Sequence, residues 1–186
     1  MNNFIKQISK RQTGLLIMDA QAKIINPIKN KDLILENIYK LLKAYEILGE
    51  NIYISEQNPI KLGTTVEKLL PKKDFKIFKK MDFSIANNKE LNNELSAKKV
   101  KKLIICGFET HICILQSVLG FLKNNFKVYL VADSISSRKI IDHEIAVWRM
   151  QSEGAILTSS ESIIFELCET SSRIEFKEIS NIIKNN

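Results

Sequence analysis

Short apolar runs alternate along the chain with longer segments in which apolar residues recur at helical spacing. Each run covers four to six residues and is bounded by polar residues or glycine, a pattern that predicts a buried β-strand. The predicted strands are Gly14–Met18, Asn51–Ser55, Lys76–Lys79, Leu103–Cys106, Lys127–Ala132 and Ala155–Thr158.

The segments between these runs predict helices, because their apolar residues recur every three or four positions. The longest helix is expected over Asp32–Leu48, with Gly49 as its C-terminal stop. Thr158–Glu161 has the spacing of a capping box for a later helix that reaches Leu167. Four other helices are predicted. One contains Leu91 and Leu95, a second begins at Thr110, and a third carries Ile141, Ile145 and Trp148 and ends before Gly154. The last closes the chain over Phe176–Ile183. We expect Trp148 to lie in the core.

Six short strands alternating with helices predict a parallel sheet that is covered by helices on both faces. The fold class is therefore α/β, a three-layer α/β/α Rossmann-like sandwich with a six-stranded, mainly parallel sheet. A chain of 186 residues is long enough for one sizeable core. We find no repeat or linker, and expect residues 1–186 to form a single domain.

Charge and cysteine content narrow the possible partners and the compartment. The net charge is +7, but the lysines are dispersed without an arginine-rich block or interleaved aromatic residues, which favours a solvated surface over nucleic-acid binding. The N-terminal segment lacks an apolar signal core, and no apolar stretch approaches the ~20 residues that cross a bilayer. Three cysteines without pairing or metal-site spacing agree with a reducing compartment. We expect a cytoplasmic protein that binds neither nucleic acid nor membrane.

Three residue types that together can make a nucleophilic site follow three of the predicted strands. Asp19 follows the first strand, Lys79 ends the third and Lys80 follows it, and Cys113 lies in the first helical turn after the fourth. The carboxyl ends of parallel strands share one edge of a sheet, where open α/β sheets bind ligands. The positive end of the helix dipole predicts a lowered thiol pKa for Cys113. Taken singly, each residue also has a structural alternative: a helix cap for Asp19, a solvated lysine, and a small buried hydrophobe for Cys113.

Several motifs in order resemble the isochorismatase-like cysteine hydrolase superfamily, especially its isochorismatase domain-containing branch. They are GLLIMDAQ, SEQNPIKLGTTV, FKKMDFS, ICGFETHICILQS, KVYLVADSISSR and FKEISNIIK. The resemblance covers nearly the whole chain. It is specific for the family and much less so for the substrate.

The resemblance implies a catalytic triad of aspartate, lysine and cysteine on a Rossmann-like fold. Asp19 matches the aspartate and Cys113 the cysteine, while Lys80 is the better match for the lysine and Lys79 stays open as its neighbour. The family pattern also implies a cis peptide bond between Phe108 and Glu109 and an oxyanion hole made by the backbone N–H groups of Glu109 and Cys113. The activity implied is cleavage of a C–N amide bond of a small molecule through a Cys113 thioester, by a protein that forms homo-oligomers.

Two departures from relatives in the superfamily sharpen this expectation. Nicotinamidases usually carry a histidine-containing metal site after the second strand, whereas this chain has Ser55–Pro59 there and only His111 and His143 in total. Neither histidine has a partner at ligand spacing, so no metal and no other cofactor is expected. His111 has either a position at the mouth of the site or a capping or surface role. True isochorismatases typically lack the nucleophilic cysteine, so Cys113 favours amide hydrolysis. The alternative is a catalytically silent member that acts as an oligomeric scaffold or binding protein.

Overall fold

One parallel sheet organises the part of the chain that the computed structural model describes, residues 8–49, 51–73 and 75–184. Within these residues the sheet has six strands in the order β3-β2-β1-β4-β5-β6, and every neighbouring pair runs parallel. The strands are β1 (Thr13–Met18), β2 (Asn51–Gln57), β3 (Lys76–Lys80), β4 (Lys102–Phe108), β5 (Lys127–Ser136) and β6 (Ile156–Thr158). The predicted α/β class and six-stranded sheet are confirmed.

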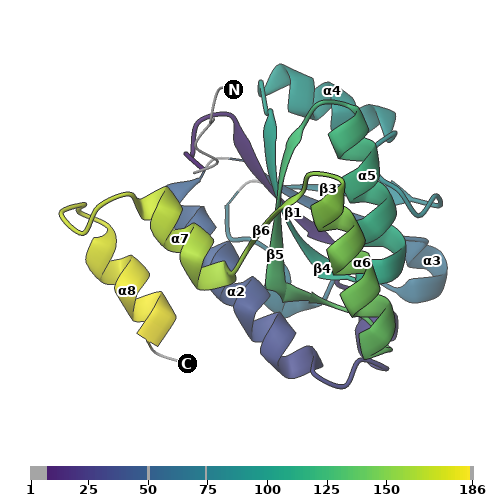
Figure 1. Cartoon of the computed structure of the whole chain (residues 1–186). Helices are drawn as coiled ribbons and strands as arrows, with labels where there is room; N and C mark the ends of the chain where they lie inside the picture. The colour runs from purple at the N-terminus through teal and green to yellow at the C-terminus, as the bar shows by residue number, and fades with distance from the viewer. Residues whose placement is uncertain (1–7, 50, 74, 185–186) are drawn as a thin grey trace.

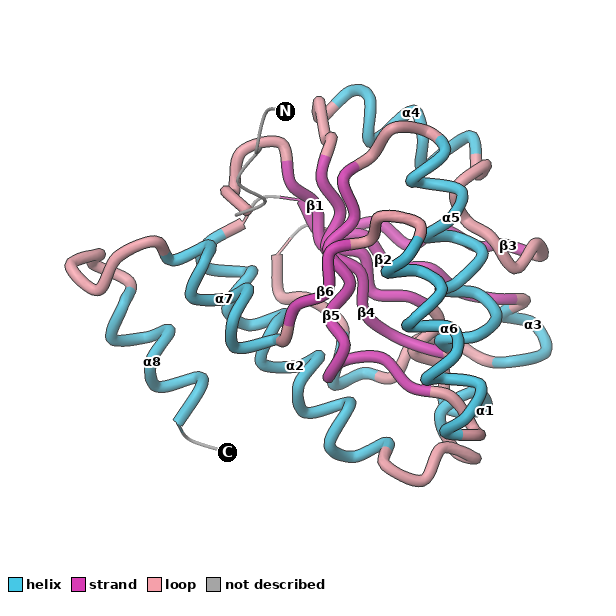
Figure 2. Tube along the Cα trace, in the orientation of Figure 1, coloured by secondary structure: helices cyan, strands magenta, loops and turns pink. Residues whose placement is uncertain are grey.

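Helices cover both faces of this sheet. Figures 1 and 2 show α2, α7 and α8 on one side and α4, α5 and α6 on the other, which gives the three predicted layers. The helices are α1 (Ala22–Ile25), α2 (Lys31–Leu48), α3 (Pro59–Leu62), α4 (Lys89–Ala97), α5 (Leu115–Lys123), α6 (Ile140–Ser152), α7 (Ser160–Cys168) and α8 (Phe176–Lys184). A 3-10 turn spans Glu67–Leu69, and a π-helical turn spans Thr110–Ile114 directly before α5.

Each face of the sheet packs its own hydrophobic cluster, because successive side chains of a strand point to opposite faces. On β1, Leu15 and Ile17 belong to the cluster under α2 and α7, whereas Leu16 and Met18 belong to the cluster under α4, α5 and α6. All four side chains are fully buried. A strand buried on both sides has an almost continuous apolar sequence, and this is why the strands were predictable.

The predicted end of α2 agrees with the structure, whereas the predicted start of α7 differs by one residue. The N–H of Gly49 donates to the Tyr45 carbonyl at 2.7 Å, so α2 ends where the glycine predicts. The N-cap of α7 is Ser159 and not Thr158, since the Ser159 hydroxyl accepts from the Ser162 N–H at 3.2 Å. The predicted capping box is therefore wrong by one residue, because two adjacent hydroxyl residues offer the same capping chemistry.

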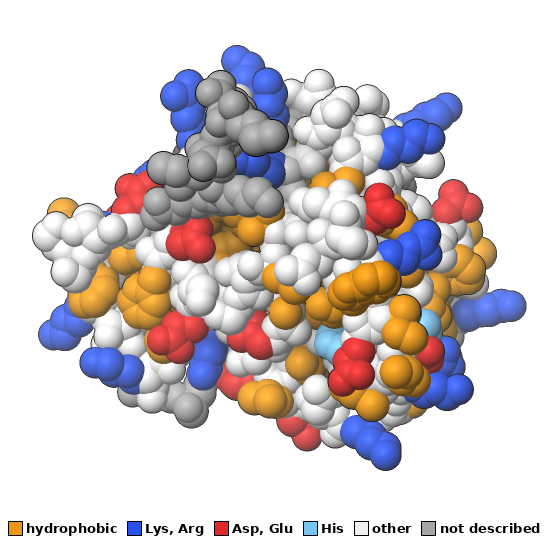
Figure 3. All heavy atoms as spheres, in the orientation of Figure 1, with side chains coloured by type: hydrophobic (Ala, Val, Ile, Leu, Met, Phe, Trp, Pro, Cys, Tyr) orange, Lys and Arg blue, Asp and Glu red, His pale blue; other side chains and the backbone are white. Residues whose placement is uncertain are grey.

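The orientation of α6 differs from the prediction for Trp148. Its buried residues are Ala146 and Met150, whereas Ile141, Ile145 and Trp148 form an exposed apolar face. Trp148 is 70% exposed and is not a core residue. Figure 3 shows hydrophobic side chains gathered over this helix. Helical spacing places residues on a common face, but it does not say whether that face meets the sheet.

No helix among the described residues is long and apolar enough to span a bilayer. The predicted single domain over residues 1–186 includes residues 1–7, 50, 74 and 185–186, which lie outside the described residues, and it stays a prediction.

Gly107 allows β4 to pass unusually close to β1. As the residue before the last of β4, it pairs with Met18, the last residue of β1, beside an irregularity in the pairing of β4 with β5. Its φ of +124° is a conformation that side chains rarely adopt, and a Cβ atom there would overlap the Met18 carbonyl oxygen. A glycine is therefore required where β4 leads into the π-helical turn.

We predict that Gly107→Ala lowers the free energy of unfolding by more than about 4 kcal/mol, since the overlap with backbone adds to the cost of the positive φ. Gly154→Ala is the matched control, because Gly154 has a φ of +107° and open space around its missing Cβ. It should cost only about 1–3 kcal/mol. Urea unfolding followed by circular dichroism measures both losses, and equal losses would contradict the role assigned to Met18.

Candidate active site

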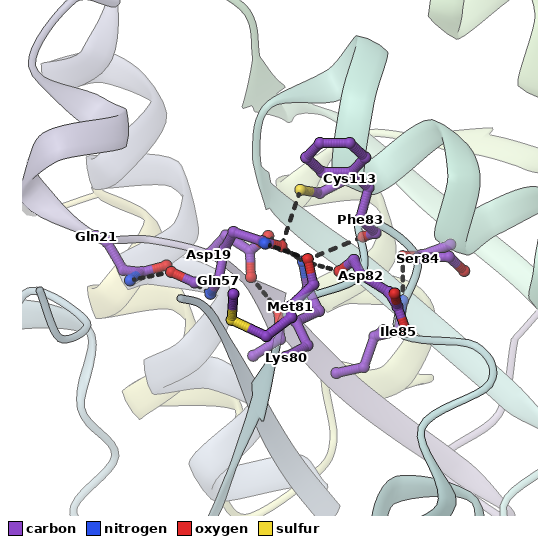
Figure 4. A network of polar contacts seen from close by, with 12 residues as sticks. Asp19, Gln21, Gln57, Lys80, Met81, Asp82, Phe83, Ser84, Ile85 and Cys113 are labelled. Atoms are coloured by element: carbon purple, nitrogen blue, oxygen red, sulfur yellow. Dashed lines mark hydrogen bonds and ion pairs between the residues drawn. The ribbon is translucent and has the colours of Figure 1, made fainter. Parts of the chain in front are cut away.

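Three strand ends bring the side chains of Asp19, Lys80 and Cys113 together. Asp19 directly follows β1, Lys80 is the last residue of β3, and Cys113 lies in the π-helical turn after β4. The Lys80 ammonium is 2.8 Å from Oδ2 of Asp19. Lys79 points to the opposite face of β3 and is exposed, so the lysine that joins the cluster is Lys80. Figure 4 shows these side chains converging beside the Cys113 sulfur.

The Asp19 carboxylate is fully buried and is held from two sides. The Ser55 hydroxyl donates to Oδ1 at 2.6 Å, and Lys80 faces Oδ2. No described residue donates a hydrogen bond of good geometry to Oδ2. The backbone of Asp19 has a φ of +50° and its N–H donates to the Ser55 carbonyl at 3.0 Å, which fixes the direction of the side chain. Oδ2 therefore keeps a lone pair that can accept a proton.

Lys80 is a buried cation surrounded by oxygen atoms. Its side chain is 3% exposed. In addition to its ion pair with Asp19, the ammonium donates hydrogen bonds to Oε1 of Gln57 at 2.6 Å and to the Phe83 carbonyl at 3.1 Å. Lysine is almost never fully buried unless it is paired, because a buried charge without partners costs several kcal/mol. These contacts fix the ammonium beside Asp19.

Gln57 links the lysine to the cysteine, and it was not singled out from the sequence. Its Oε1 accepts from Lys80 and lies 3.9 Å from the sulfur of Cys113. Its Nε2 donates to the Met81 carbonyl at 2.7 Å, and its backbone exchanges two hydrogen bonds with the Gln21 amide. No local pattern in the sequence marks Gln57, because its role depends on the register of the sheet, in which it pairs with Lys80 across β2 and β3.

Burial controls the protonation of Cys113. The side chain is 5% exposed, and burial together with the negative charge of Asp19 raises the pKa of the Cys113 thiol to about 12, although Lys80 acts in the opposite direction. The lowered pKa predicted from the helix dipole is wrong, because loss of hydration outweighs a dipole effect of about 1 kcal/mol. Burial therefore disfavours the thiolate of Cys113 in the folded site.

The turn that carries Cys113 has an unusual backbone. The peptide bond between Phe108 and Glu109 is cis, where the family pattern implied it. The Ile114 N–H donates to the Glu109 carbonyl at 3.3 Å across the π-helical turn. This turn replaces the regular first helical turn that was expected from Thr110. π-helical turns are rare and occur often at functional sites.

A cavity of about 250 Å³ opens onto the Cys113 side chain. Apolar side chains from four segments form much of its wall, and charged groups stand among them. The lining residues are Lys23, Ile24, Pro27, Gln57, Leu62, Phe83, Glu109, Ile112, Cys113 and Arg138. A larger hollow of about 710 Å³ lies between α2 and α8, but none of Asp19, Lys80 and Cys113 lines it. The smaller cavity is therefore the candidate substrate site.

The histidine and the two other cysteines considered from the sequence do not line the cavity. His111 does not line the cavity, since its Nδ1 lies 2.9 Å from the Ser137 hydroxyl and its Nε2 lies 3.9 Å from the Asp142 carboxylate. Cys106 and Cys168 are buried free thiols. Among the described residues, no group of three histidine, cysteine, aspartate or glutamate side chains could hold a metal ion.

Comparison with known proteins places this site in a family. The family model of the isochorismatase domain matches residues 13–162. Isochorismatase family protein 1B of Dictyostelium discoideum is 36% identical over 96% of this chain and 89% of its own length. The MAR1 ribonuclease structure from Caenorhabditis elegans superposes with a TM-score of 0.88 at 34% identity, covering 95% of this chain and 92% of that one.

A more distant structure shows the same fold. The YcaC protein of Escherichia coli, an octameric hydrolase of unknown specificity, has a TM-score of 0.85 at 18% identity and covers 100% of this chain and 98% of its own. The chain belongs to the isochorismatase family of isochorismatase-like hydrolases. The resemblance identified from the motifs is confirmed.

The charges of Asp19 and Lys80 predict the direction in which two substitutions change the pKa of the Cys113 thiol. Asp19→Asn removes a negative charge beside the thiol and should lower its pKa, whereas Lys80→Met removes the cation and should raise it. At pH 8 we expect iodoacetamide to alkylate Cys113 about tenfold faster in Asp19→Asn and about tenfold slower in Lys80→Met, each corresponding to about one pKa unit. In the native protein, labelling should keep rising with pH well above the ordinary thiol range.

Mass spectrometry of the labelled peptides measures these rates. Cys106 and Cys168, which are almost completely buried, report any unfolding of a variant within the same sample. Slower labelling of Asp19→Asn than of the native protein would contradict this electrostatic description.

Proposed function

We propose that this protein is a cysteine hydrolase that cleaves the C–N bond of a small-molecule amide through a thioester on Cys113, without a metal or another cofactor. The observation that carries the proposal is a thiol at the wall of a small cavity, next to a buried carboxylate–ammonium pair. Membership of a hydrolase family and the free lone pair on Asp19 support the same chemistry.

In the first step Asp19 is the general base. Its Oδ2 takes the thiol proton while the Cys113 sulfur attacks the amide carbonyl carbon, and the carbonyl oxygen becomes an oxyanion. The backbone N–H groups of Glu109 and Cys113 are the proposed donors to that oxyanion. A base is needed because burial raises the pKa of the Cys113 thiol to about 12 and so disfavours the thiolate.

In the second half of the reaction the same carboxyl group returns its proton. Protonated Asp19 gives the proton to the leaving amine as the C–N bond breaks, which leaves the acyl group on Cys113. A water molecule then attacks the thioester carbonyl and loses a proton to Asp19. The C–S bond breaks, the acid is released, and the proton on Asp19 returns to the sulfur. Lys80 is assigned a positioning role, since it holds the carboxylate in place and opposes the rise in thiol pKa.

The relative from Caenorhabditis elegans raises ribonuclease activity as a second candidate function, because it is named a ribonuclease and is 34% identical. The cavity favours a small amide. Its volume lies below the range of about 300–1,000 Å³ typical of sites for drug-sized ligands, and apolar side chains form much of its wall. A third candidate is a catalytically silent scaffold.

We predict that Cys113→Ala abolishes turnover of any amide that the native protein hydrolyses, lowering kcat at least about a thousandfold. Cys168→Ala is the matched control, because Cys168 is a buried thiol in α7 outside the cavity, and it should retain activity. Release of ammonia from a panel of primary amides measures turnover, and intact mass spectrometry detects the acyl group on Cys113. RNA cleavage without amide hydrolysis, equal in both variants, would overturn the proposal.

We also propose that the protein is a cytoplasmic homo-oligomer. The three free cysteines favour a reducing compartment. The exposed apolar face of α6 provides a surface suited to self-association, and the Escherichia coli relative forms an octamer.

We predict that Ile145→Lys lowers the molar mass measured by light scattering after size-exclusion chromatography, because a charge buried in an interface is costly. Ile145 is 56% exposed on α6. The control is Ile174→Lys, since Ile174 is 98% exposed in the segment between α7 and α8 and should not change the mass. A monomeric native protein, or equal masses for both variants, would contradict self-association through α6.

A further inference from the structure

The mouth of the cavity at Cys113 is charged, whereas its interior is neutral. Lys23 and Arg138 line the cavity and are exposed, and they come from α1 and from the segment between β5 and α6. Deeper in the site, the charges of Asp19 and Lys80 offset each other in a buried ion pair. The charge that an entering molecule meets is therefore set by the residues at the mouth.

The positive charge of Arg138 is balanced by the carboxylate of Glu109. Oε2 of Glu109 accepts from the backbone N–H and from Nε of Arg138, each at 3.0 Å. A guanidinium has four further N–H donors, and the structure records no partner for them among the described residues. The pair contributes no net charge, but it presents donors at the mouth.

The other cation has no acid beside it. The Lys23 ammonium donates to the Lys61 carbonyl at 2.6 Å, which is a neutral acceptor, and no described carboxylate lies within ion-pair distance of it. Because Lys23 is not paired with an acid, the residues that line the cavity together carry one net positive charge. Ile24, Leu62 and Ile112 line the same cavity and give it an apolar wall.

We propose that the substrate is a small amide that carries a carboxylate at the end remote from the scissile bond, with a short apolar segment between the two. This inference rests on the proposed hydrolase function and names its substrate class. The carboxylate meets Lys23 and the free donors of Arg138, the apolar segment contacts the wall, and the amide carbonyl reaches Cys113. A cavity of about 250 Å³ has room for about eight atoms the size of a water oxygen, which fits a short chain.

Two alkylating reagents that differ in charge test the preference without requiring turnover. Iodoacetate is an anion and iodoacetamide is neutral, so the ratio of their rates at Cys113, divided by the same ratio for free cysteine, isolates the effect of the site. We expect this normalised ratio to exceed one by about three- to tenfold at low ionic strength and to fall towards one in 0.5 M salt, a salt concentration chosen to screen exposed charges.

Two lysine substitutions test whether the preference for the anionic reagent comes from the charge at the mouth of the cavity. Lys23→Gln should lower the normalised ratio about threefold or more and leave the iodoacetamide rate unchanged, which shows that the site is intact. Lys101→Gln is the control, because it removes the same charge from an exposed lysine just before β4, at the opposite edge of the sheet. A normalised ratio of one in the native protein, or equal effects of both substitutions, would overturn the inference.

Rates of amide hydrolysis test the proposed carboxylate preference and the proposed hydrolase function separately. Succinamic acid and butyramide are amides of similar size that differ in the carboxylate. Preference for succinamic acid that is lost in Lys23→Gln supports the inference. Hydrolysis of butyramide as fast as succinamic acid, dependent on Cys113, would overturn it and leave the hydrolase proposal standing. A raised alkylation ratio with no amide hydrolysed would support the anion preference and count against the hydrolase.

Discussion

The buried ion pair between Lys80 and Asp19 is the contact on which the arrangement of the site depends. Both side chains are almost completely removed from water, so each charge needs the other and a set of hydrogen bonds to be tolerated. Ser55 and Gln57 supply those bonds from β2, the strand that lies between β1 and β3. Three strand ends are thereby tied together at the carboxyl edge of the sheet.

This network is possible because the strands are parallel and in a specific register. Met18 pairs with Ser55, and Gln57 pairs with Lys80, so the residues that follow β1 and end β3 lie level with their partners on β2. A shift of one residue in either pairing would turn the polar side chain to the other face of the sheet. The register that places the side chains of each strand on their two faces of the core therefore also positions the ion pair.

Much of the fold could be predicted from the sequence, because strands buried on both faces leave a strong local pattern. The candidate site was predictable in part, since Asp19, Lys80 and Cys113 stand at strand ends or just after them. Gln57 was not recognised, because its role depends on pairing between β2 and β3 and not on a local pattern. Trp148 was misplaced because a helix can present either a large or a small apolar face to the sheet, and α6 buries Ala146 and Met150.

The protonation of Cys113 was the least predictable feature, and it has the largest consequence for the chemistry. A position in the first helical turn favours thiolate, but the sequence does not show how much water the folded site excludes. Burial raises the pKa of the Cys113 thiol to about 12, so the proposed attack on a carbonyl includes transfer of the thiol proton to a nearby base. Asp19 acts on the thiol directly, and no described residue donates a hydrogen bond of good geometry to its Oδ2. Lys80 holds the carboxylate in place through the ion pair, and its charge also stabilises the thiolate as that charge forms. In the proposed mechanism the negative charge moves from Asp19 to the sulfur while remaining beside the same buried cation. The ion pair thus supports both ends of the proton transfer.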